Sequence, residues 1–372
     1  MDPETLPRHA RVPAECRFSN EVAAAAARLE TRLARLDGCS IEISDYIRGY
    51  LARHQAKLRY TLQKDSYLLM LALSGSGVPL EDFVLVDYGG GVGTLSMLAR
   101  EVGVGTVIYL DVYDVSCRDA AVIAGELGCT ADRYVHGEMA ELLGCVESGP
   151  GRCDAVVSVN VIEHVYDIDA LLVGLAALPG ERLAAVLATT ANPFNPARQV
   201  QLRWKHHRYE HSDRRPAPGH KGTDTLESYV GARRGIISRR IEDEGGHLTT
   251  NELNRLAAAM RGLAGRDVEA AAVEYLRSGA LPRPGHRTNT CDPTSGNWME
   301  RLMNPYRLAG RMADLGFVTD VLPGYYASSQ PLVKALAGPL NWSISRLRER
   351  TALLLAPSYI LHAKLIRRCQ AH

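Results

Sequence analysis

The stretch Phe83-Val84-Leu85-Val86-Asp87-Tyr88-Gly89-Gly90-Gly91-Val92-Gly93 indicates how this chain of 372 residues is expected to fold. Its aliphatic beginning is typical of a buried parallel strand. Gly89, Gly91 and Gly93 then recur at alternate positions, and glycine permits both a tight turn and a close approach of the backbone to a ligand. A helix is expected to begin near Thr94. The stretch therefore predicts the strand, loop and helix of a nucleotide-binding sheet.

Strand and helix signals alternate from this stretch as far as Thr190. This alternation predicts a doubly wound, Rossmann-like α/β sheet with helices on both faces. Ligands of such sheets bind beyond the carboxyl ends of the strands, so the residues at those ends are the first candidates for a binding site. The predicted strands end at Asp87, Asp111, His136, Asn160 and Thr190.

The spacing of the glycines narrows the class of ligand. The D-x-G-x-G-x-G order from Asp87 to Gly93 resembles the first motif of class I S-adenosylmethionine (SAM) methyltransferases. The G-x-G-x-x-G fingerprint of nicotinamide oxidoreductases fits less well, because its third glycine would fall on Thr94. Further along, Val161-Ile162-Glu163-His164-Val165 resembles small-molecule members of the family, of the ubiquinone-biosynthesis O-methyltransferase type.

This resemblance implies an enzyme that moves a methyl group from SAM to an oxygen or nitrogen atom of a small-molecule acceptor. It also implies a seven-stranded, mostly parallel sheet whose sixth strand is Val318 to Leu322 and whose last strand, Tyr359 to Ile366, is antiparallel. N-terminal helices and a helical insertion after the fifth strand would complete the fold. Two other functions stay open: a SAM-binding protein without catalysis whose insertion binds a partner, and, less favoured, an RNA or protein methyltransferase.

Acids at the strand ends supply the expected cofactor contacts. Asp111 follows Gly93 by 18 residues, close to the ~20-residue spacing of a ribose-binding acid. A carboxylate can accept hydrogen bonds from both ribose hydroxyls. By resemblance, Asp87 would lie near the ammonium end of SAM, Glu138 and Met139 at the adenine, and Asn160 beside the methyl group. The residues assigned to the cofactor are Asp87, Tyr88, Gly89, Gly91, Gly93, Asp111, Val112, Glu138, Met139 and Asn160.

Each of these acids also has a purely structural interpretation. Asp111 could cap the following helix, although Asp114 is available for that role. Glu138 could be a helix N-terminal acid that the helix dipole favours. Glu163 and His164 could open a helix and orient the cofactor loop.

Four side chains are candidates for a general base: His164, His206, His207 and Tyr209. Histidine is the usual choice because its unperturbed pKa lies near neutrality. The last three belong to the His- and Arg-rich run from Trp204 to His211. His207 and His211 are four residues apart, as helical metal ligands can be, but no third ligand follows at a recognisable spacing. We therefore predict no metal site.

The sequence predicts four parts. Residues 1–78 form an N-terminal helical cap, 79–190 the SAM-binding core, 191–303 a mostly helical insertion or lid, and 304–372 the completion of the sheet with an extra helical segment. The insertion is expected to be helical from Thr249 to Arg277, and Thr351 to Leu361 is expected to be a buried strand. The Asn-Pro pairs at Asn192 and Asn304 are interpreted as turns.

Composition excludes several classes of function. A formal charge of +1 offers no field for binding nucleic acid through its phosphates. None of the eight cysteines forms a C-x-x-C pair, which favours reduced thiols and a cytoplasmic location. No run approaches the ~18 apolar residues of a membrane span, and the N-terminus has no apolar signal core. The expected partner is a small-molecule methyl acceptor, and a homodimer is left open.

Overall fold

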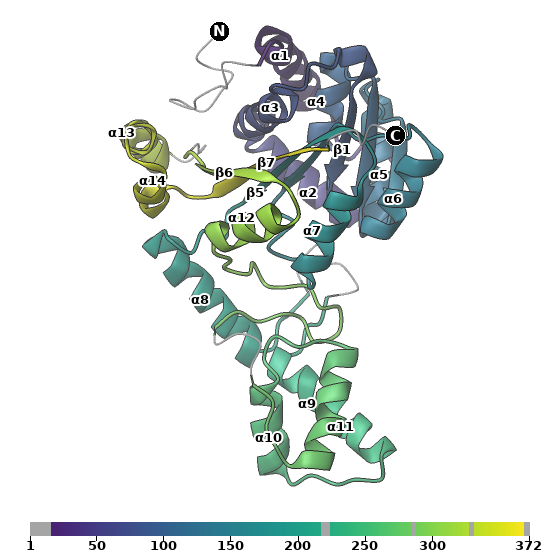
Figure 1. The fold of residues 1–372 in the computed structure, drawn as a ribbon, viewed down its shortest axis with the longest axis vertical. Helices are drawn as coiled ribbons and strands as arrows, with labels where there is room; N and C mark the ends of the chain where they lie inside the picture. The colour runs from purple at the N-terminus through teal and green to yellow at the C-terminus, as the bar shows by residue number, and fades with distance from the viewer. Residues whose placement is uncertain (1–15, 217–223, 284–287, 327–330, 368–372) are drawn as a thin grey trace. The chain divides into compact units, whose positions relative to one another are not determined.

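The computed structural model describes residues 16–216, 224–283, 288–326 and 331–367, with the side chains of 331–335 left aside. The chain divides into two compact units, whose helices are labelled in Figure 1. The first unit comprises Met1–Ile162, Ile168–Asn195 and Asn304–His372. The second comprises Glu163–Asp167 and Pro196–Met303.

The first unit is built around a seven-stranded sheet with the order β3-β2-β1-β4-β5-β7-β6. The strands from β1 to β5 pair in parallel, and β7 is antiparallel to both β5 and β6. This confirms the predicted doubly wound, Rossmann-like fold with an antiparallel last strand. The strands are β1 (Val84–Tyr88), β2 (Thr106–Asp111), β3 (Arg133–His136), β4 (Ala155–Val159), β5 (Arg182–Thr189), β6 (Val318–Pro323) and β7 (Tyr359–Ile366).

The strand order places a switch point between β1 and β4. From β1 the chain builds β2 and β3 on one side, and it then returns to add β4 and β5 on the other. In the register, Tyr88 of β1 is paired with Leu110 on one side and Ser158 on the other. Every residue of β1 is buried, as expected of a central parallel strand covered on both faces. Ligands of this class of sheet bind where the connections diverge.

Helices connect these strands and cover the sheet. Helix α4 begins at Thr94, the predicted position. One expectation is wrong: the apolar run from Thr351 to Leu361 is not a single strand, since its first part forms α14. Pro357 disfavours the helical conformation of Ala356, so the helix ends there and β7 begins at Tyr359. These helices are α4 (Thr94–Val102), α5 (Asp114–Glu126), α6 (Met139–Ser148), α7 (Ile168–Ala177), α12 (Pro305–Asp314), α13 (Pro331–Arg346) and α14 (Glu349–Leu355), with a 3-10 turn at Leu80–Asp82.

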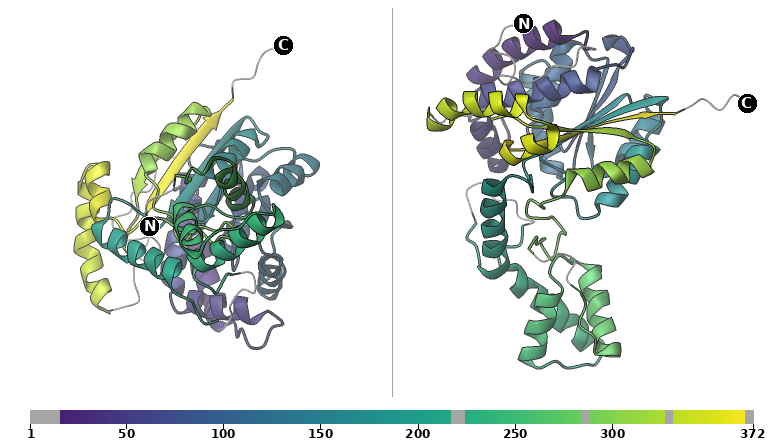
Figure 2. Two further views of the ribbon diagram at one scale, coloured as in Figure 1. Left: turned by 90° about the horizontal axis from the view of Figure 1, so that it is seen from below. Right: turned by 60° about the vertical axis from the view of Figure 1, so that its left-hand side comes forward.

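Three N-terminal helices belong to the same unit: α1 (Ser19–Arg35), α2 (Asp45–Gln55) and α3 (Leu58–Leu73). Helix α1 packs against α3 and α4, and α3 also contacts β4 and β5. Apolar residues of all three helices share one hydrophobic core with those of the sheet and α4. Figure 2 shows the purple N-terminal helices beside the strands of the sheet. They are therefore part of the same compact unit as the sheet.

The second unit is helical, with α8 (Pro196–His211), α9 (Tyr229–Asp243), α10 (Thr250–Ala259) and α11 (Arg266–Ser278). The stretch from Thr249 to Arg277, which was expected to be helical, forms two helices, and the first, α10, ends at Ala259. Gly262 and Gly265 adopt positive φ between α10 and α11, a conformation that breaks a right-handed helix. The small core of this unit contains Ile237, Ile241, Leu256, Ala257, Met260, Val268 and Ala272.

A buried ion pair lies beside this core. The guanidinium of Arg233 donates to the carboxylate of Glu210, and both side chains are almost inaccessible to solvent. Arg233 Nε also donates to the carbonyl of Ala257 at 3.0 Å, and the hydroxyl of Thr290 donates to Glu210 at 2.5 Å. The pair therefore joins α8, α9 and α10 to the segment that follows α11.

Among the described residues, no helix has both the length and the apolar character needed to cross a bilayer.

Candidate functional site

The loop between β1 and α4, residues 89–93, is shaped by its glycines. Gly89 has φ 75° and Gly91 has φ 56°, values that residues with a Cβ rarely adopt. A Cβ on Gly89 would lie 2.4 Å from Val161 Cγ2, and one on Gly91 would lie 2.9 Å from Tyr50 Cε1. The loop is held to β2, because the hydroxyl of Tyr109 donates a hydrogen bond to the Gly91 carbonyl at 2.7 Å. The glycines therefore permit a close approach to the loop that side chains would prevent.

Asp111, at the end of β2, contacts this loop directly. Its Oδ2 accepts from the backbone N–H of Gly91 at 3.1 Å, and its Oδ1 accepts from the N–H of Tyr113 at 2.9 Å. Tyr113 is the residue just before α5, and the start of this helix has no side-chain cap. The carboxylate thus links the end of β2 to the glycine loop and to the turn before α5, and its contact with a ribose stays a prediction.

Asp87, at the end of β1, is buried under the loop, with 3% of its surface exposed. Its Oδ2 accepts from both the N–H and the hydroxyl of Ser96, at 3.1 and 2.8 Å. Burial raises the pKa of Asp87 to about 7; the bonds from Ser96 oppose this rise, and the nearby carboxylates of Asp65 and Asp111 add to it. A cation close to Asp87 would offset the cost of burying its charge.

The structural role proposed for Glu138 has direct support. Glu138 caps α6 and forms a capping box with Glu141, and the side chain of each residue accepts from the backbone of the other. Met139 packs against α7, since a Cβ on Gly174 would lie 2.1 Å from Met139 Cγ. Burial, together with Glu138 and Glu141, raises the pKa of Tyr88 to about 12. Contact of Glu138 and Met139 with adenine stays a prediction.

Asn160 lies just beyond β4 in the left-handed conformation, with φ 56°. Asparagine tolerates this conformation better than most residues. Its N–H donates to Ala188 O at 2.8 Å, and its Oδ1 accepts from the N–H of Thr190 at 3.1 Å. Asn160 therefore joins the carboxyl ends of β4 and β5. Val112 follows Asp111 and is 45% exposed, so its side chain is accessible to a ligand at that edge.

A cluster of aromatic side chains on α2 was not predicted from the sequence. The ring of Tyr50 lies against Gly91, and His54 packs edge-on to Tyr50 with their centroids 4.6 Å apart. Nδ1 of His54 is 3.5 Å from the hydroxyl of Thr94, the first residue of α4. The sequence carried one signal, because Tyr46, Tyr50 and His54 recur at intervals of four and so share one helical face.

The predicted bases lie in the second unit. His164 Nδ1–H donates to the carbonyl of Trp298 at 2.7 Å, so Nε2 is the proton-accepting nitrogen of its neutral ring. His206 is fully buried, and its Nε2 contacts the carbonyl of Met299 at 2.5 Å. Burial lowers the pKa of His206. Of these two histidines, only His164 has a partly exposed ring.

The other two candidates are surface residues of α8. His207 is exposed and its ring packs against that of His211, with centroids 4.7 Å apart. Tyr209 is covered by the guanidinium of Arg214 at 4.0 Å from its ring centroid. Within the described ranges, no three His, Cys, Asp or Glu side chains are grouped as metal ligands.

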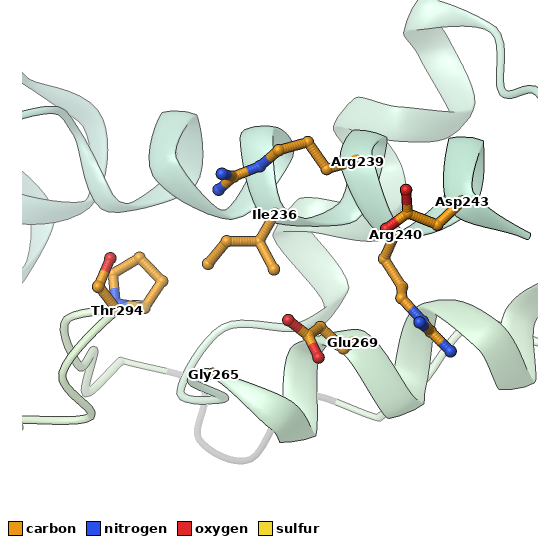
Figure 3. A pocket seen from close by; sticks show the side chains of 8 residues that line it. Ile236, Arg239, Arg240, Asp243, Gly265, Glu269 and Thr294 are labelled. Atoms are coloured by element: carbon orange, nitrogen blue, oxygen red, sulfur yellow. The ribbon is translucent and has the colours of Figure 1, made fainter.

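The second unit also contains an open cavity of about 370 Å³. Figure 3 shows Ile236, Arg239 and Arg240 of α9 on one side of it and Glu269 of α11 on the other. Asp243, Gly265, Pro293 and Thr294 complete the lining. Two arginines and two acids give the cavity no dominant charge, and none of the predicted site residues lines it.

No known family profile and no curated protein matches this chain. Matches were found among solved structures. One is PKMT2 from Rickettsia typhi in complex with AdoHcy (14% identity, TM-score 0.36), where the match covers 78% of this chain and 50% of the other. The chain thus spans about half the length of that protein.

Two shorter proteins match over most of their length. A SAM-dependent methyltransferase from Archaeoglobus fulgidus is 14% identical with a TM-score of 0.36, covering 76% of this chain and 86% of the other. An S-adenosylmethionine-dependent methyltransferase from Mesorhizobium loti is 12% identical with a TM-score of 0.37, covering 80% and 95%. At these values the likeness carries no functional conclusion, and the site has to be interpreted from its own residues.

Proposed function

We propose that this chain is a SAM-dependent methyltransferase that transfers a methyl group to an oxygen or nitrogen atom of a small-molecule acceptor. The observation that supports this most is the hydrogen bond between the Gly91 N–H and the Asp111 carboxylate. It joins the glycine loop of β1 to the acid that ends β2, beside the switch point of the sheet. An adenosyl ligand needs both features. The glycine loop lets the ligand lie close to the protein backbone, and the carboxylate accepts hydrogen bonds from the ribose hydroxyls.

The chemistry of the remaining residues fits SAM better than a nucleotide phosphate. The loop is flanked by Asp87 and Asp111, and carboxylates at that position would repel a phosphate. SAM instead carries a sulfonium and an α-ammonium group. The buried Asp87, whose pKa is raised to about 7, would become more stable as a carboxylate beside either cation.

When bound, SAM supplies an electrophilic methyl group on its sulfonium. In this proposal the loop and Asp111 hold the adenosyl part together with Glu138 and Met139. Asn160 lies beside the methyl group, and Asp87 faces the amino-acid end. The protein then contributes mainly alignment, which can equal effective molarities of roughly 10⁵–10⁸ M. His164, through Nε2, is the leading candidate to remove a proton from the acceptor.

The proposal is tested first by binding. Asp111→Ala should weaken S-adenosylhomocysteine binding by ~1.5–3 kcal/mol, roughly tenfold or more, because charge-assisted hydrogen bonds to the ribose are lost. Calorimetry measures the affinity, and far-UV circular dichroism checks that the variant is folded. Asp114→Asn, at the start of α5, is the matched control and should bind as the wild type does. Equal affinity in both variants would rule out the ribose role of Asp111.

Transfer is tested separately. Incubation of the wild-type chain with methyl-labelled SAM and a fractionated cell extract should move the label into a small-molecule fraction. Binding without transfer to any fraction would favour the non-catalytic alternative, and label in RNA or protein would redirect the choice of acceptor.

A further inference from the structure

The segment Glu163–Asp167 belongs to the second unit, although β4 before it and α7 after it belong to the first. Its backbone pairs with a later stretch of the second unit. The N–H of Trp298 donates to the carbonyl of His164 at 3.1 Å, and the N–H of Arg301 donates to that of Glu163 at 2.9 Å. The guanidinium of Arg301 also lies over the Trp298 ring, 4.4 Å from its centroid. The second unit therefore holds the backbone of the candidate base His164.

Trp298 contacts both His164 and Tyr166. Its carbonyl accepts from the Nδ1–H of His164 at 2.7 Å, and its indole N–H donates to the Tyr166 carbonyl at 3.2 Å. The rings of Trp298 and Tyr166 stack with their centroids 6.3 Å apart. Trp298 forms a small buried core with Ala264 and Cys291, and Tyr166 packs against it. A displacement of Tyr166 should therefore reach the His164 ring through Trp298.

The hydroxyl of Tyr166 joins this group to the start of α11. It donates to Oδ2 of Asp267 at 2.5 Å and accepts from the N–H of Ala264 at 3.1 Å. Asp267 lies in the first turn of α11. Burial raises the pKa of Tyr166, and so does its hydrogen bond to Asp267, so the hydroxyl keeps its proton and remains a donor at neutral pH. Through these two bonds the start of α11 holds the Tyr166 ring.

The Trp298 carbonyl determines which nitrogen of His164 carries the proton. Since a carbonyl only accepts hydrogen bonds, it favours the Nδ1–H tautomer and leaves the lone pair on Nε2. A general base needs that lone pair to take a proton from the acceptor. When the partner that fixes a catalytic histidine is lost, the wrong tautomer can lower turnover by up to about 10⁴-fold.

We propose that Tyr166 and Asp267 are positioning residues of the methyl transfer. They hold Trp298, and Trp298 holds His164 in the tautomer whose Nε2 accepts a proton. This inference rests on the proposed function, because it takes His164 as the residue that deprotonates the acceptor. It assigns a task to the helical second unit, which is to fix the orientation of the base.

Two variants loosen this arrangement. Tyr166→Phe removes the hydroxyl but keeps the ring that stacks on Trp298, and Asp267→Ala removes the acceptor of its hydrogen bond. The matched controls are Tyr275→Phe, on a partly buried tyrosine of α11, and Glu269→Ala, on the other acid in the first turn of α11. Hydrogen exchange in the sheet and in α9, equal to that of the wild type, shows that both units are folded.

The His164 ring gives a readout that does not depend on activity. In the full-length chain with nitrogen-labelled histidine, NMR shows which ring nitrogen is protonated, and His164→Gln identifies the signals of this ring. The neutral ring of the wild type should carry its proton on Nδ1. In Tyr166→Phe and Asp267→Ala the population should shift toward the Nε2–H tautomer, and both control variants should keep the wild-type tautomer.

Transfer from methyl-labelled SAM into the small-molecule fraction of a cell extract gives the catalytic readout. Turnover should fall by roughly tenfold or more in both variants, part of the ~10²–10⁴-fold that a general base contributes, while the KM for SAM stays unchanged. If the folded wild type transfers no label, the proposed function fails, and the NMR result still decides whether Tyr166 and Asp267 position His164. The proposal is overturned if His164 keeps its Nδ1–H tautomer in both variants, or if the tautomer changes and turnover does not.

Discussion

At the scale of single residues, Asp87 links stability to binding. The pKa of its buried carboxyl rises from 3.8 to about 7 in the folded chain. The folded state therefore holds this proton more tightly than the unfolded state does. The stability contributed by the proton is complete below about pH 4 and is lost as the pH rises through about 7.

Replacement of Asp87 by Asn should remove this pH dependence. At pH 8 the variant should unfold with a free energy higher than that of the wild type by up to about 4 kcal/mol, and at pH 4 the two should agree. Urea unfolding at the two pH values measures the difference. The same variant should bind S-adenosylhomocysteine more weakly, because the carboxylate facing the ammonium is gone. A stability difference that is equal at both pH values would contradict the assigned pKa.

Gly91→Ala tests the close approach at the loop. Both strain at φ 56° and contact with the Tyr50 ring should destabilise the fold by about 1–2 kcal/mol or more, and S-adenosylhomocysteine binding should fall at least tenfold. Gly128→Ala is the matched control, since φ is 62° there and a Cβ meets no atom within 4 Å. It should lose stability but keep its affinity. Equal affinities for the two variants would show that the loop does not contact the ligand.

His164→Ala tests the proposed base. Turnover should fall by ~10²-fold or more, with the affinity for S-adenosylhomocysteine unchanged, because a general base acts on the acceptor rather than on the cofactor. His247→Ala, before α10, is the control and should retain activity. Near-normal turnover in His164→Ala would return His164 to a structural role, consistent with its bond to Trp298 O.

At the scale of elements, the Arg233–Glu210 ion pair joins helices of the second unit and should contribute to their stability. Glu210→Gln leaves a fully buried guanidinium without its counter-charge, which typically costs 3–5 kcal/mol. Hydrogen exchange in α9 and α10 should increase accordingly. Glu244→Gln removes only the exposed pair with Arg240 and should change stability by less than about 1 kcal/mol. Equal protection in the two variants would mean that the buried pair is not needed.

The elements that could be predicted are those with local signals. The end of β2 at Asp111, the end of β1 one residue beyond the predicted Asp87, and the helix start at Thr94 follow from apolar runs and glycines that act over a few residues. The break between α10 and α11 had its signal in Gly262 and Gly265, and the division of the last apolar run had its signal in Pro357. The predictions for these two segments followed the spacing of their apolar residues and gave too little weight to the glycines and the proline.

The cluster on α2 could not be predicted in the same way. Its contacts with Gly91 and Thr94 join segments 40 or more residues apart, and only packing in the common core brings them together. The pKa values of Asp87 and His54 depend on that burial as well. Sequence could identify the loop and its acids, but not the side chains that cover them.

At the scale of the whole molecule, the residues that would bind SAM belong to the first unit, and those predicted to act as bases belong to the second. The N-terminal helices, the loop and the sheet of the first unit all contribute residues to one hydrophobic core. SAM binding and methyl transfer therefore have to be measured on the full chain. Binding is measured first, because methyl transfer requires bound SAM.

The most direct test is a calorimetric titration of the folded, full-length chain with S-adenosylhomocysteine. We predict saturable binding at one site, weakened roughly tenfold or more by Asp111→Ala and left intact by Asp114→Asn. A fully folded wild-type chain that binds neither S-adenosylhomocysteine nor SAM would contradict it.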